Sequence, residues 1–475
     1  MCSLELSDGA SGARSPKLFL NLPATTMRSR SLLPILALIL TVKLGACSDP
    51  LLVEEHDATT ATEITAPFQK LRHAHLLTTS TMSASKNSAN PRLIIGFTQP
   101  VLDANHFLQR YHFLQRYHFL QRYDGTQEVI YGVSVKVDLD DFGDGDDDDD
   151  GNDDDDRLEE ILELLEQDAD VAWIEPDVAL GVLPLLAFEP GKENQVTPWG
   201  IAHVGANGLG LAPQDFANVD LYILDTAIRT EDLNVVEQLD FIGSGQPGRH
   251  GFHVTGTAAA LDDSTGVLGV APGVRVHSFG VLDANGQTET STVIAALQEV
   301  RTRKLLDPDG AVVVNISLGA DIGTTTYNAL DEAVEDAVAA GVVVVVSAGN
   351  DGIDAATVTP AHAAGAITVG AYDAGETFAA FSNYGPVVDI LAPGVDILSL
   401  GFDANGQPGL ALNTGTSMAA PHVAGAAALY LAAHPNATPS QVRDALVQQA
   451  QALITSAPPR TTNRALWVGF LDGDT

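Results

Sequence analysis

The sequence predicts an α/β protein with a doubly wound, mostly parallel sheet, preceded by a small α+β unit. Two observations lead to this prediction. Between residues 195 and 475, short apolar runs alternate with stretches of helical spacing, the order that builds a parallel sheet from strand–helix–strand units. Residues 91–180 instead hold three strand-like runs and one helical stretch, which is typical of a small α+β unit.

The expected elements of the C-terminal block follow from its apolar runs and helical stretches. Because ligands bind at the carboxyl ends of the strands in such folds, functional residues are expected directly after the apolar runs. Strands are expected over five runs and helices over two stretches: 219–224, 274–282, 311–316, 342–347 and 367–371 for the strands, and 292–303 and 327–340 for the helices.

Within the smaller unit, the sequence RLIIGF at 92–97, the alternating run at 129–137 and VAWIE at 171–175 predict strands. The spacing of RLEEILELLE at 157–166 predicts a helix. Residues 106–123 repeat HFLQRY three times, which we interpret as duplication of a helical segment.

A run of aspartates over residues 138–156 forms a second insertion. Asp146, Asp148, Asp150 and Gly151 match the first half of a calcium-binding loop. The twelfth position of that loop would be Arg157 instead of the required glutamate, so the match is incomplete. We therefore expect a solvated, self-repelling loop with weak calcium binding at most.

Composition narrows the class of function. The chain of 475 residues carries a formal net charge of −38, which repels phosphate backbones and argues against a nucleic-acid partner. Hydrophobic residues make up 45%, enough for a sizeable core. The two cysteines, Cys2 and Cys47, both precede the expected domains, which excludes a disulfide framework or a cysteine zinc site in the rest of the chain.

The N-terminal region is expected to direct export. Arg28 and Arg30 precede an apolar run at 32–42 that is too short to span a bilayer, so residues 1–48 are interpreted as a signal-peptide region, with Met27 a candidate initiator. The run ends in LGAC, which resembles a bacterial lipoprotein box and makes Cys47 a candidate lipid anchor; the alternative is a plain signal peptide. Residues 49–90, rich in Thr, Ser and Ala, are expected to be a linker.

Four motifs carry the functional prediction. Asp225 ends the run VDLYILD, His250 lies in RHGFHVTGT, and Asn350 follows VVVVVSAG. Ser417 begins a helix of small residues in NTGTSMAAPHVAG. Together, and in this chain order, the motifs resemble the subtilisin-like serine proteases (the subtilase family), in particular their proteinase K-like branch.

The resemblance implies a serine-type endopeptidase. Ser417 would be the nucleophile, His250 the general base and Asp225 the carboxylate that orients it. The Asn350 side chain and the Ser417 backbone N–H would form the oxyanion hole. His253, the second histidine of its motif, would be structural. The chain departs from the family pattern at Ala227, Arg249 and Phe252, which puts rate and pH optimum in question but leaves the mechanism unchanged.

The resemblance also implies where a substrate binds. One strand edge at 317–319, a second edge at 280–292 and a wall at 347–349 would hold an extended peptide as an added strand. The walls are small and no acid is expected at the base, which favours apolar or aromatic side chains before the cleaved bond. The implied substrate-binding residues are Ser317, Leu318, Gly319, Ser347, Ala348, Gly349 and Gly286.

A structural calcium ion (Ca2+) is implied by the segment LDDSTGV at 261–267. The ligands would all be oxygen atoms, as a hard cation prefers, although an ordinary acidic surface turn is the alternative. The implied metal ligands are Gln195, Asp232, Leu261, Asp263, Thr265 and Val267.

Residues 91–190 resemble the inhibitory pro-domain of the family (inhibitor I9 type), which acts as an intramolecular chaperone and inhibitor and is then removed. The peptidase domain would span 194–475, with the cut between Leu185 and Gln195. The sequence thus predicts a secreted or surface-anchored, monomeric, self-processing endopeptidase acting on proteins or peptides. Two alternatives remain open: a catalytically silent binding module on this fold, and a calcium-dependent surface protein.

Overall fold

The structure is a computed structural model, and it describes residues 70–72, 91–101, 104–111, 113–123, 128–139, 153–182, 195–209, 213–243, 247–403 and 406–471. All of them belong to Thr60–Thr475, one of the two units into which the chain divides. The predicted signal region with Cys47 and the calcium-loop-like residues 146–151 lie outside this description. No helix within the described ranges is both long and apolar enough to cross a membrane.

The C-terminal block is built on a nine-stranded sheet in the order β18-β19-β15-β14-β12-β10-β6-β8-β7, as far as the structure describes the chain. Every adjacent pair in it is parallel except β18 and β19, so the predicted doubly wound α/β fold is confirmed. Its strands are β6 (Val219–Thr226), β7 (Val235–Asp240), β8 (Arg275–Leu282), β10 (Ala311–Ile316), β12 (Val343–Ser347), β14 (Ile367–Tyr372), β15 (Ile390–Pro393), β18 (Gln451–Ala452) and β19 (Arg464–Ala465).

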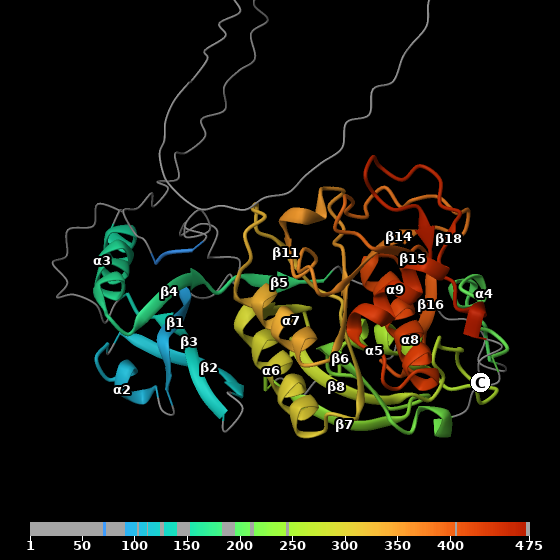
Figure 1. Cartoon of the computed structure of the whole chain (residues 1–475), viewed down its shortest axis with the longest axis horizontal. Helices are drawn as coiled ribbons and strands as arrows, with labels where there is room; N and C mark the ends of the chain where they lie inside the picture. The colour runs from blue at the N-terminus through green and yellow to red at the C-terminus, as the bar shows by residue number, and fades with distance from the viewer. Residues whose placement is uncertain are drawn as a thin grey trace, which may run out of the picture. The chain divides into compact units, whose positions relative to one another are not determined.

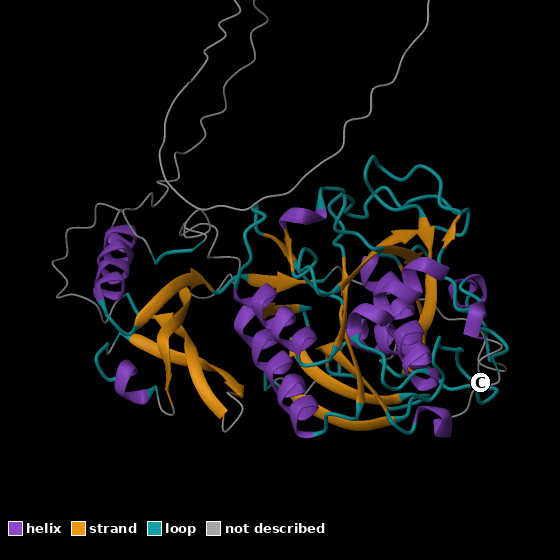
Figure 2. Cartoon of the chain, viewed as in Figure 1, coloured by secondary structure: helices purple, strands orange, loops and turns teal. Residues whose placement is uncertain are grey.

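Helices and short strands complete this block (Figures 1 and 2). The helices are α4 (Trp199–His203), α5 (Arg249–Ala259), α6 (Thr290–Leu306), α7 (Ala329–Ala339), α8 (Thr416–Ala433) and α9 (Pro439–Gln449), with 3-10 turns η2 (Pro213–Phe216), η3 (Ala355–Thr357) and η4 (Gly469–Leu471). The short strands are β9 (Gln287–Glu289), β11 (Ala320–Asp321), β13 (Val358–Thr359), β16 (Ile397–Phe402) and β17 (Pro408–Asn413).

The two faces of the sheet bury alternate residues of the same strands. Leu221 and Ile223 of β6 lie in one apolar cluster with residues of α5 and α8. Tyr222 and Leu224 lie in another with residues of α6 and α7. Because successive side chains of a strand point to opposite faces, a strand covered on both sides must be apolar throughout. This explains why the predicted runs are continuous.

Helix α8 packs against the middle strands β6, β10, β12 and β14 of the sheet and is apolar on nearly every side. Its small residues allow close packing: a Cβ at Gly425 would lie 2.7 Å from the Val270 Cβ. A helix that is hydrophobic all round is a buried one. The close packing fixes the N-terminus of α8, where Ser417 lies.

The smaller unit is a four-stranded antiparallel sheet, in the order β2-β3-β1-β4, with one long helix. Leu158, Ile161, Leu162 and Leu165 of the helix are buried in the same apolar cluster as residues of the strands. The predicted strands and helix are present. The elements are β1 (Arg92–Val101), α2 (Asn105–Leu108), β2 (Leu114–Tyr123), β3 (Glu128–Val137), α3 (Asp153–Gln167), β4 (Val171–Pro176) and β5 (Ala179–Gly181).

Two predictions about the insertions are wrong in part. The HFLQRY copies are not all helical, because three residues of the first lie in α2 whereas the third lies entirely in β2. Identical letters adopt different structures because Phe107 fills the apolar cluster of the unit, while β2 pairs with β3. The aspartate run is not all loop either, since α3 begins at Asp153, where acidic residues favour a helix N-terminus.

Candidate active site

Asp225 and His250 form a buried pair at the carboxyl end of β6. Asp225 is the next-to-last residue of the strand and is 0% exposed, and His250 lies in the first turn of α5 and is 4% exposed. The His250 Nδ1 lies 2.9 and 2.8 Å from the two carboxylate oxygens, and the Thr226 N–H donates to one of them at 2.7 Å. The pair therefore holds the ring with its Nε2 available for a proton.

Ser417 lies at the N-terminus of α8, and its hydroxyl is held by a different group. The Ser417 Oγ donates to the Ser317 carbonyl at 3.0 Å, and the Ser317 Oγ donates back to the Ser417 carbonyl at 3.1 Å. These two described residues therefore join the ends of β10 and α8. No hydrogen bond joins Ser417 to His250 in the structure, so the geometry shows the Asp225–His250 half of the expected triad but not the third bond.

Asn350 is oriented by the residue that precedes Ser417. The Thr416 N–H and the Thr416 hydroxyl donate to the Asn350 Oδ1 at 2.8 and 3.0 Å. With its oxygen occupied in this way, the amide keeps its Nδ2 donors for another acceptor. The Asn350 amide and the N-terminus of α8 are thus arranged as donors beside Ser417.

His253 has a structural environment. It is fully buried, and its Nε2 lies 2.9 Å from the Ile397 carbonyl and 3.2 Å from the Ala411 carbonyl. Burial lowers its pKa to about 3, so the ring stays neutral and holds β16 and β17 at their Ile397 and Ala411 carbonyls. Phe252, one of the departures from the family pattern, is buried in the core near Phe402 rather than in the groove.

A peptide strand already lies between the two predicted substrate edges. On one side β5 pairs antiparallel with β9, and the Val182 N–H donates to the Gly286 carbonyl at 3.1 Å. On the other side Gly181 forms an antiparallel bridge with Gly319. Gly286 has a φ of +75°, and a Cβ there would lie 2.4 Å from the Val182 side chain. The groove therefore holds an extended chain by its backbone.

A pocket of about 470 Å³ adjoins this strand. It brings together Ser417, Asn350, Leu318 and residues of the predicted wall, Ser347 and Gly349, while Ala348 is buried and accepts a bond from Asn383 at 2.9 Å. Two exposed aspartates, Asp321 and Asp351, also line the pocket. The walls of the pocket are formed by small residues, as the sequence indicates. Acidic side chains border the pocket, however, whereas the sequence led us to expect no acidic side chain at its base.

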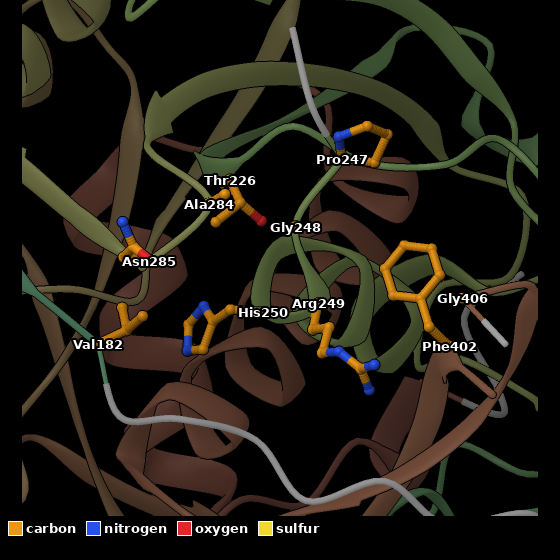
Figure 3. A pocket seen from close by; sticks show the side chains of 11 residues that line it. Val182, Thr226, Pro247, Gly248, Arg249, His250, Ala284, Asn285, Phe402 and Gly406 are labelled. Atoms are coloured by element: carbon orange, nitrogen blue, oxygen red, sulfur yellow. The ribbon is translucent and has the colours of Figure 1, made fainter. Parts of the chain in front are cut away.

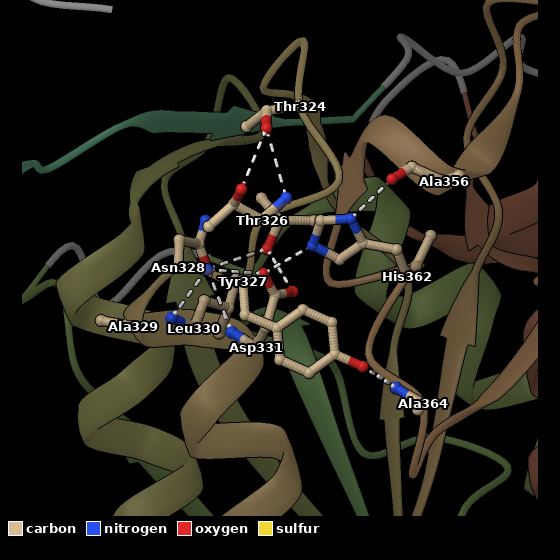
Figure 4. Close-up of polar contacts among 12 residues, drawn as sticks. Thr324, Thr326, Tyr327, Asn328, Ala329, Leu330, Asp331, Ala356, His362 and Ala364 are labelled. Carbon is tan, nitrogen blue, oxygen red and sulfur yellow. Dashed lines mark hydrogen bonds and ion pairs between the residues drawn. The ribbon is translucent and has the colours of Figure 1, made fainter. Parts of the chain in front are cut away.

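The edge that contains Gly319 is supported by a buried polar network at the start of α7 (Figure 4). The Asp331 carboxylate accepts from the Thr359 hydroxyl at 2.8 Å and lies 2.7 Å from the His362 Nε2. Although burial opposes the charged ring, the bond to Asp331 raises the pKa of His362. A Cβ at Gly319 would lie 2.7 Å from the Thr359 carbonyl, so the network fixes the strand against which the peptide lies.

The predicted calcium ligands lie together and fit a hard cation. The Gln195 amide nitrogen lies 2.5 Å from the Leu261 carbonyl and 3.3 Å from that of Val267, so two carbonyls converge on one donor. The Asp232 Oδ1 is buried and has no partner. Burial raises the pKa of Asp232 to about 7. Converging carbonyls beside an unsatisfied carboxylate oxygen are what an oxygen-ligated cation requires.

Asp263 and Thr265 of this segment hydrogen-bond each other, since the Thr265 N–H and hydroxyl donate to the Asp263 Oδ1 at 3.0 and 2.8 Å. Among the described residues no group of three or more acidic, histidine or cysteine side chains forms a metal cluster, so any ion here would depend mainly on carbonyl oxygens. An amide flip of Gln195 would add its oxygen to the set.

The smaller unit caps two helices of the C-terminal block, which the sequence did not suggest. The Asp177 carboxylate accepts from the Ser291 N–H at 2.9 Å and the Ser291 hydroxyl at 2.6 Å, at the start of α6. Glu175 accepts from the Ala329 N–H at 3.0 Å, at the start of α7. Side-chain oxygens at helix N-termini are favourable because they satisfy N–H groups that have no partner within the helix.

Sequence reasoning also missed the residues that hold the site in place, namely Thr416, Asn383 and Asn315. Asn315 donates to the Ser317 Oγ at 2.9 Å. Only Asn315 carried a signal, because it is a polar residue inside the apolar run AVVVNI. A buried polar residue in such a run needs a partner, and this could have pointed to Ser317.

With this geometry established, comparison with known proteins identifies the class of protein. The model of the subtilase family matches residues 228–466. Subtilisin DY of Bacillus licheniformis is 40% identical over 269 residues, which are 54% of this chain and 93% of that protein. The extracellular serine proteinase of Thermus sp. (strain Rt41A) is 38% identical over 331 residues, 66% of this chain and 74% of that protein.

The chain therefore belongs to the subtilase family of serine peptidases, and its substrates are proteins or peptides. Among solved structures, a cold adapted subtilisin-like serine proteinase is 31% identical and superposes with a TM-score of 0.49, covering 58% of this chain and 98% of that one.

Proposed function

We propose that this chain is an exported serine endopeptidase that is made as a proenzyme and processes itself. The observation that carries the proposal is the buried Asp225–His250 pair, which adjoins a groove containing a bound peptide strand, Ser417 and Asn350. The name of the Thermus relative, an extracellular proteinase, supports export of this chain.

In the proposed reaction, the Ser417 side chain rotates away from the Ser317 carbonyl toward the His250 Nε2. His250 takes the hydroxyl proton while Ser417 attacks the scissile carbonyl, and Asp225 stabilises the imidazolium that forms. The Asn350 Nδ2 and the Ser417 N–H donate to the oxyanion. His250 then protonates the leaving amine, and a water molecule repeats the sequence to release the acyl fragment. Such hydrogen bonds often form only when substrate is bound.

A fluorophosphonate probe tests this function. We expect it to label Ser417 in the processed protein, since the probe needs an activated serine, and we expect that protein to cleave casein. Labelling is read by mass spectrometry of the Ser417 peptide, with probe applied to heat-denatured protein as the control. If the processed protein is neither labelled nor active, the silent binding module would be favoured, for which the bond from Ser417 to Ser317 is the supporting observation.

Residues 91–190 are proposed to act as the inhibitory pro-domain and folding chaperone. The occupied groove supports this, because a substrate could not bind where β5 lies. So do the caps that Glu175 and Asp177 place on two helices of the peptidase domain. The cut between Leu185 and Gln195 remains a prediction, because residues 183–194 lie outside the described ranges. A monomeric enzyme, an I9-type pro-domain and membership of the proteinase K-like branch also remain proposals.

We also propose that a calcium ion binds between Gln195, Asp232 and the carbonyls of Leu261 and Val267, with Asp263 and Thr265 completing the set. The ion would stabilise the peptidase domain by binding its folded state alone. Removing calcium with EDTA is expected to lower the melting temperature by about 10 °C, if calcium is initially some thousandfold above its Kd. Differential scanning calorimetry measures the shift.

Asp232→Asn should melt at a lower temperature in calcium and become insensitive to EDTA. Asp262→Asn is the matched control, because Asp262 is an exposed neighbour outside the proposed ligand set. A wild-type melting temperature unchanged by EDTA would overturn the calcium proposal and favour an ordinary acidic turn.

A further inference from the structure

A second pocket, of about 570 Å³, lies beside His250 and contains an arginine (Figure 3). None of its described lining residues is a carboxylate, so apart from the histidine the only charge on it is that of Arg249. The lining residues are Val182, Thr226, Pro247, Gly248, Arg249, His250, Ala284, Asn285, Gly286, Phe402 and Gly406.

Arg249 is exposed and forms no ion pair with any residue that the structure describes; its guanidinium lies 5.9 Å from the centre of the Phe402 ring. Two other described arginines of the peptidase block without an ion pair, Arg301 and Arg464, donate to backbone carbonyls instead. Four other arginines of the peptidase block pair with carboxylates: Arg229, Arg275, Arg303 and Arg443. A guanidinium left free over an aromatic ring is arranged to bind an anion that comes from outside the chain.

The bound strand shows which part of a substrate would meet this arginine. Val182 directly follows β5 and lines both pockets, and Figure 3 shows Val182 and Arg249 on opposite sides of the His250 ring. Residues of an extended chain face the same side at every second position. In a substrate held in the same way, the residue after the Val182 position would face Ser417 and Asn350, and the residue after that would face Arg249.

From this geometry we propose that Arg249 is a specificity-determining residue that selects substrates with Asp or Glu immediately after the cleaved bond. The inference rests on the proposed endopeptidase function and adds a substrate preference to it. Asp321 and Asp351 line the other pocket, so their charge favours placing an acidic side chain on the Arg249 side of the bond. The Phe402 ring, which lines the same pocket, lies within reach of a cation–π contact with Arg249.

Two quenched fluorescent peptides that differ only by Glu or Gln after the cleaved bond test this proposal with the processed product of the full chain. We expect kcat/KM to be about threefold to fivefold higher for the Glu peptide at low salt, the scale of an exposed ion pair. In 1 M NaCl, where the Debye length is about 3 Å, the ratio should approach one.

In Arg249→Gln the Glu-to-Gln ratio should fall to about one, whereas Arg249→Lys should retain part of it. Arg229→Gln, which changes an arginine outside the pocket, is the control and should keep the full ratio. Because the ratio compares two peptides on one enzyme, a change in the overall rate caused by altering a neighbour of His250 cancels. Failure to cleave either peptide would contradict the proposed function; cleavage of both without preference, or a preference that survives in Arg249→Gln, would contradict only the role of Arg249.

Discussion

Replacing Ser417 by alanine is expected to abolish proteolysis and to leave the precursor uncut. The change removes the hydroxyl that forms the acyl intermediate of the proposed reaction. Because removal of the nucleophile of a subtilisin is the reference case for such losses, we take its magnitude, about 10⁶-fold in kcat, as the expected scale. The casein assay measures activity, and gel electrophoresis with N-terminal sequencing measures processing.

The control for this change is Ser440→Ala, because Ser440 is exposed at the start of α9 and takes no part in the proposed reaction. It should behave as wild type in both assays. If Ser417→Ala folded normally but kept more than a small fraction of the wild-type activity, another residue would have to be the nucleophile. His250→Ala is expected to lose activity to a similar extent, since nucleophile and base act as one unit.

Raising the pH is expected to loosen the smaller unit from the peptidase domain. Glu175 is fully buried against α7, and burial raises its pKa from about 4.5 to about 8. The docked state therefore holds more protons than the undocked state between these two values. Docking is strongest below the ordinary glutamate pKa and weakens as the pH rises toward 8. The equilibrium constant for docking falls by as much as tenfold per pH unit in this range.

Hydrogen exchange of the Ser417→Ala precursor measures this effect without self-cleavage. The protection of the amides in β5 and at the start of α7, corrected for intrinsic rates, should fall steeply between pH 5 and pH 8. Glu175→Gln should flatten the dependence, because an amide caps the helix without titrating in this range. Glu159→Gln, which changes an exposed glutamate of α3, is the matched control and should leave it steep. Equal slopes for Glu175→Gln and wild type would assign the pH dependence to another group.

Much of the fold could be predicted because its signal is local. The runs that became β6, β8, β10, β12 and β14 are continuous because both faces of the sheet are covered. Burial on both faces is therefore visible in the sequence as an uninterrupted apolar run. The residues of the candidate site were predictable from the resemblance of their motifs to the subtilase family. Two of them, Asp225 and Asn350, also follow apolar runs of the sheet, whose carboxyl ends meet at one edge.

The insertions and the supporting contacts could not be predicted in this way. The HFLQRY copies became part of a helix and a strand because of what each packs against, which identical letters cannot distinguish. Asp177 bonds to Ser291 across 114 residues of chain, and no periodicity records such a pairing. The same holds for the hydroxyl of Ser417, whose partner is a carbonyl 100 residues away.

The sequence by itself determined the class of fold and the residues able to do the chemistry, because strand periodicity and reactive groups are properties of short segments. Only the tertiary structure decided that β5 lies in the groove, that two carboxylates cap α6 and α7, and that Arg249 stands free beside His250. Each of these features depends on contacts between segments that are far apart in the sequence. Those contacts are set by the packing of the whole chain.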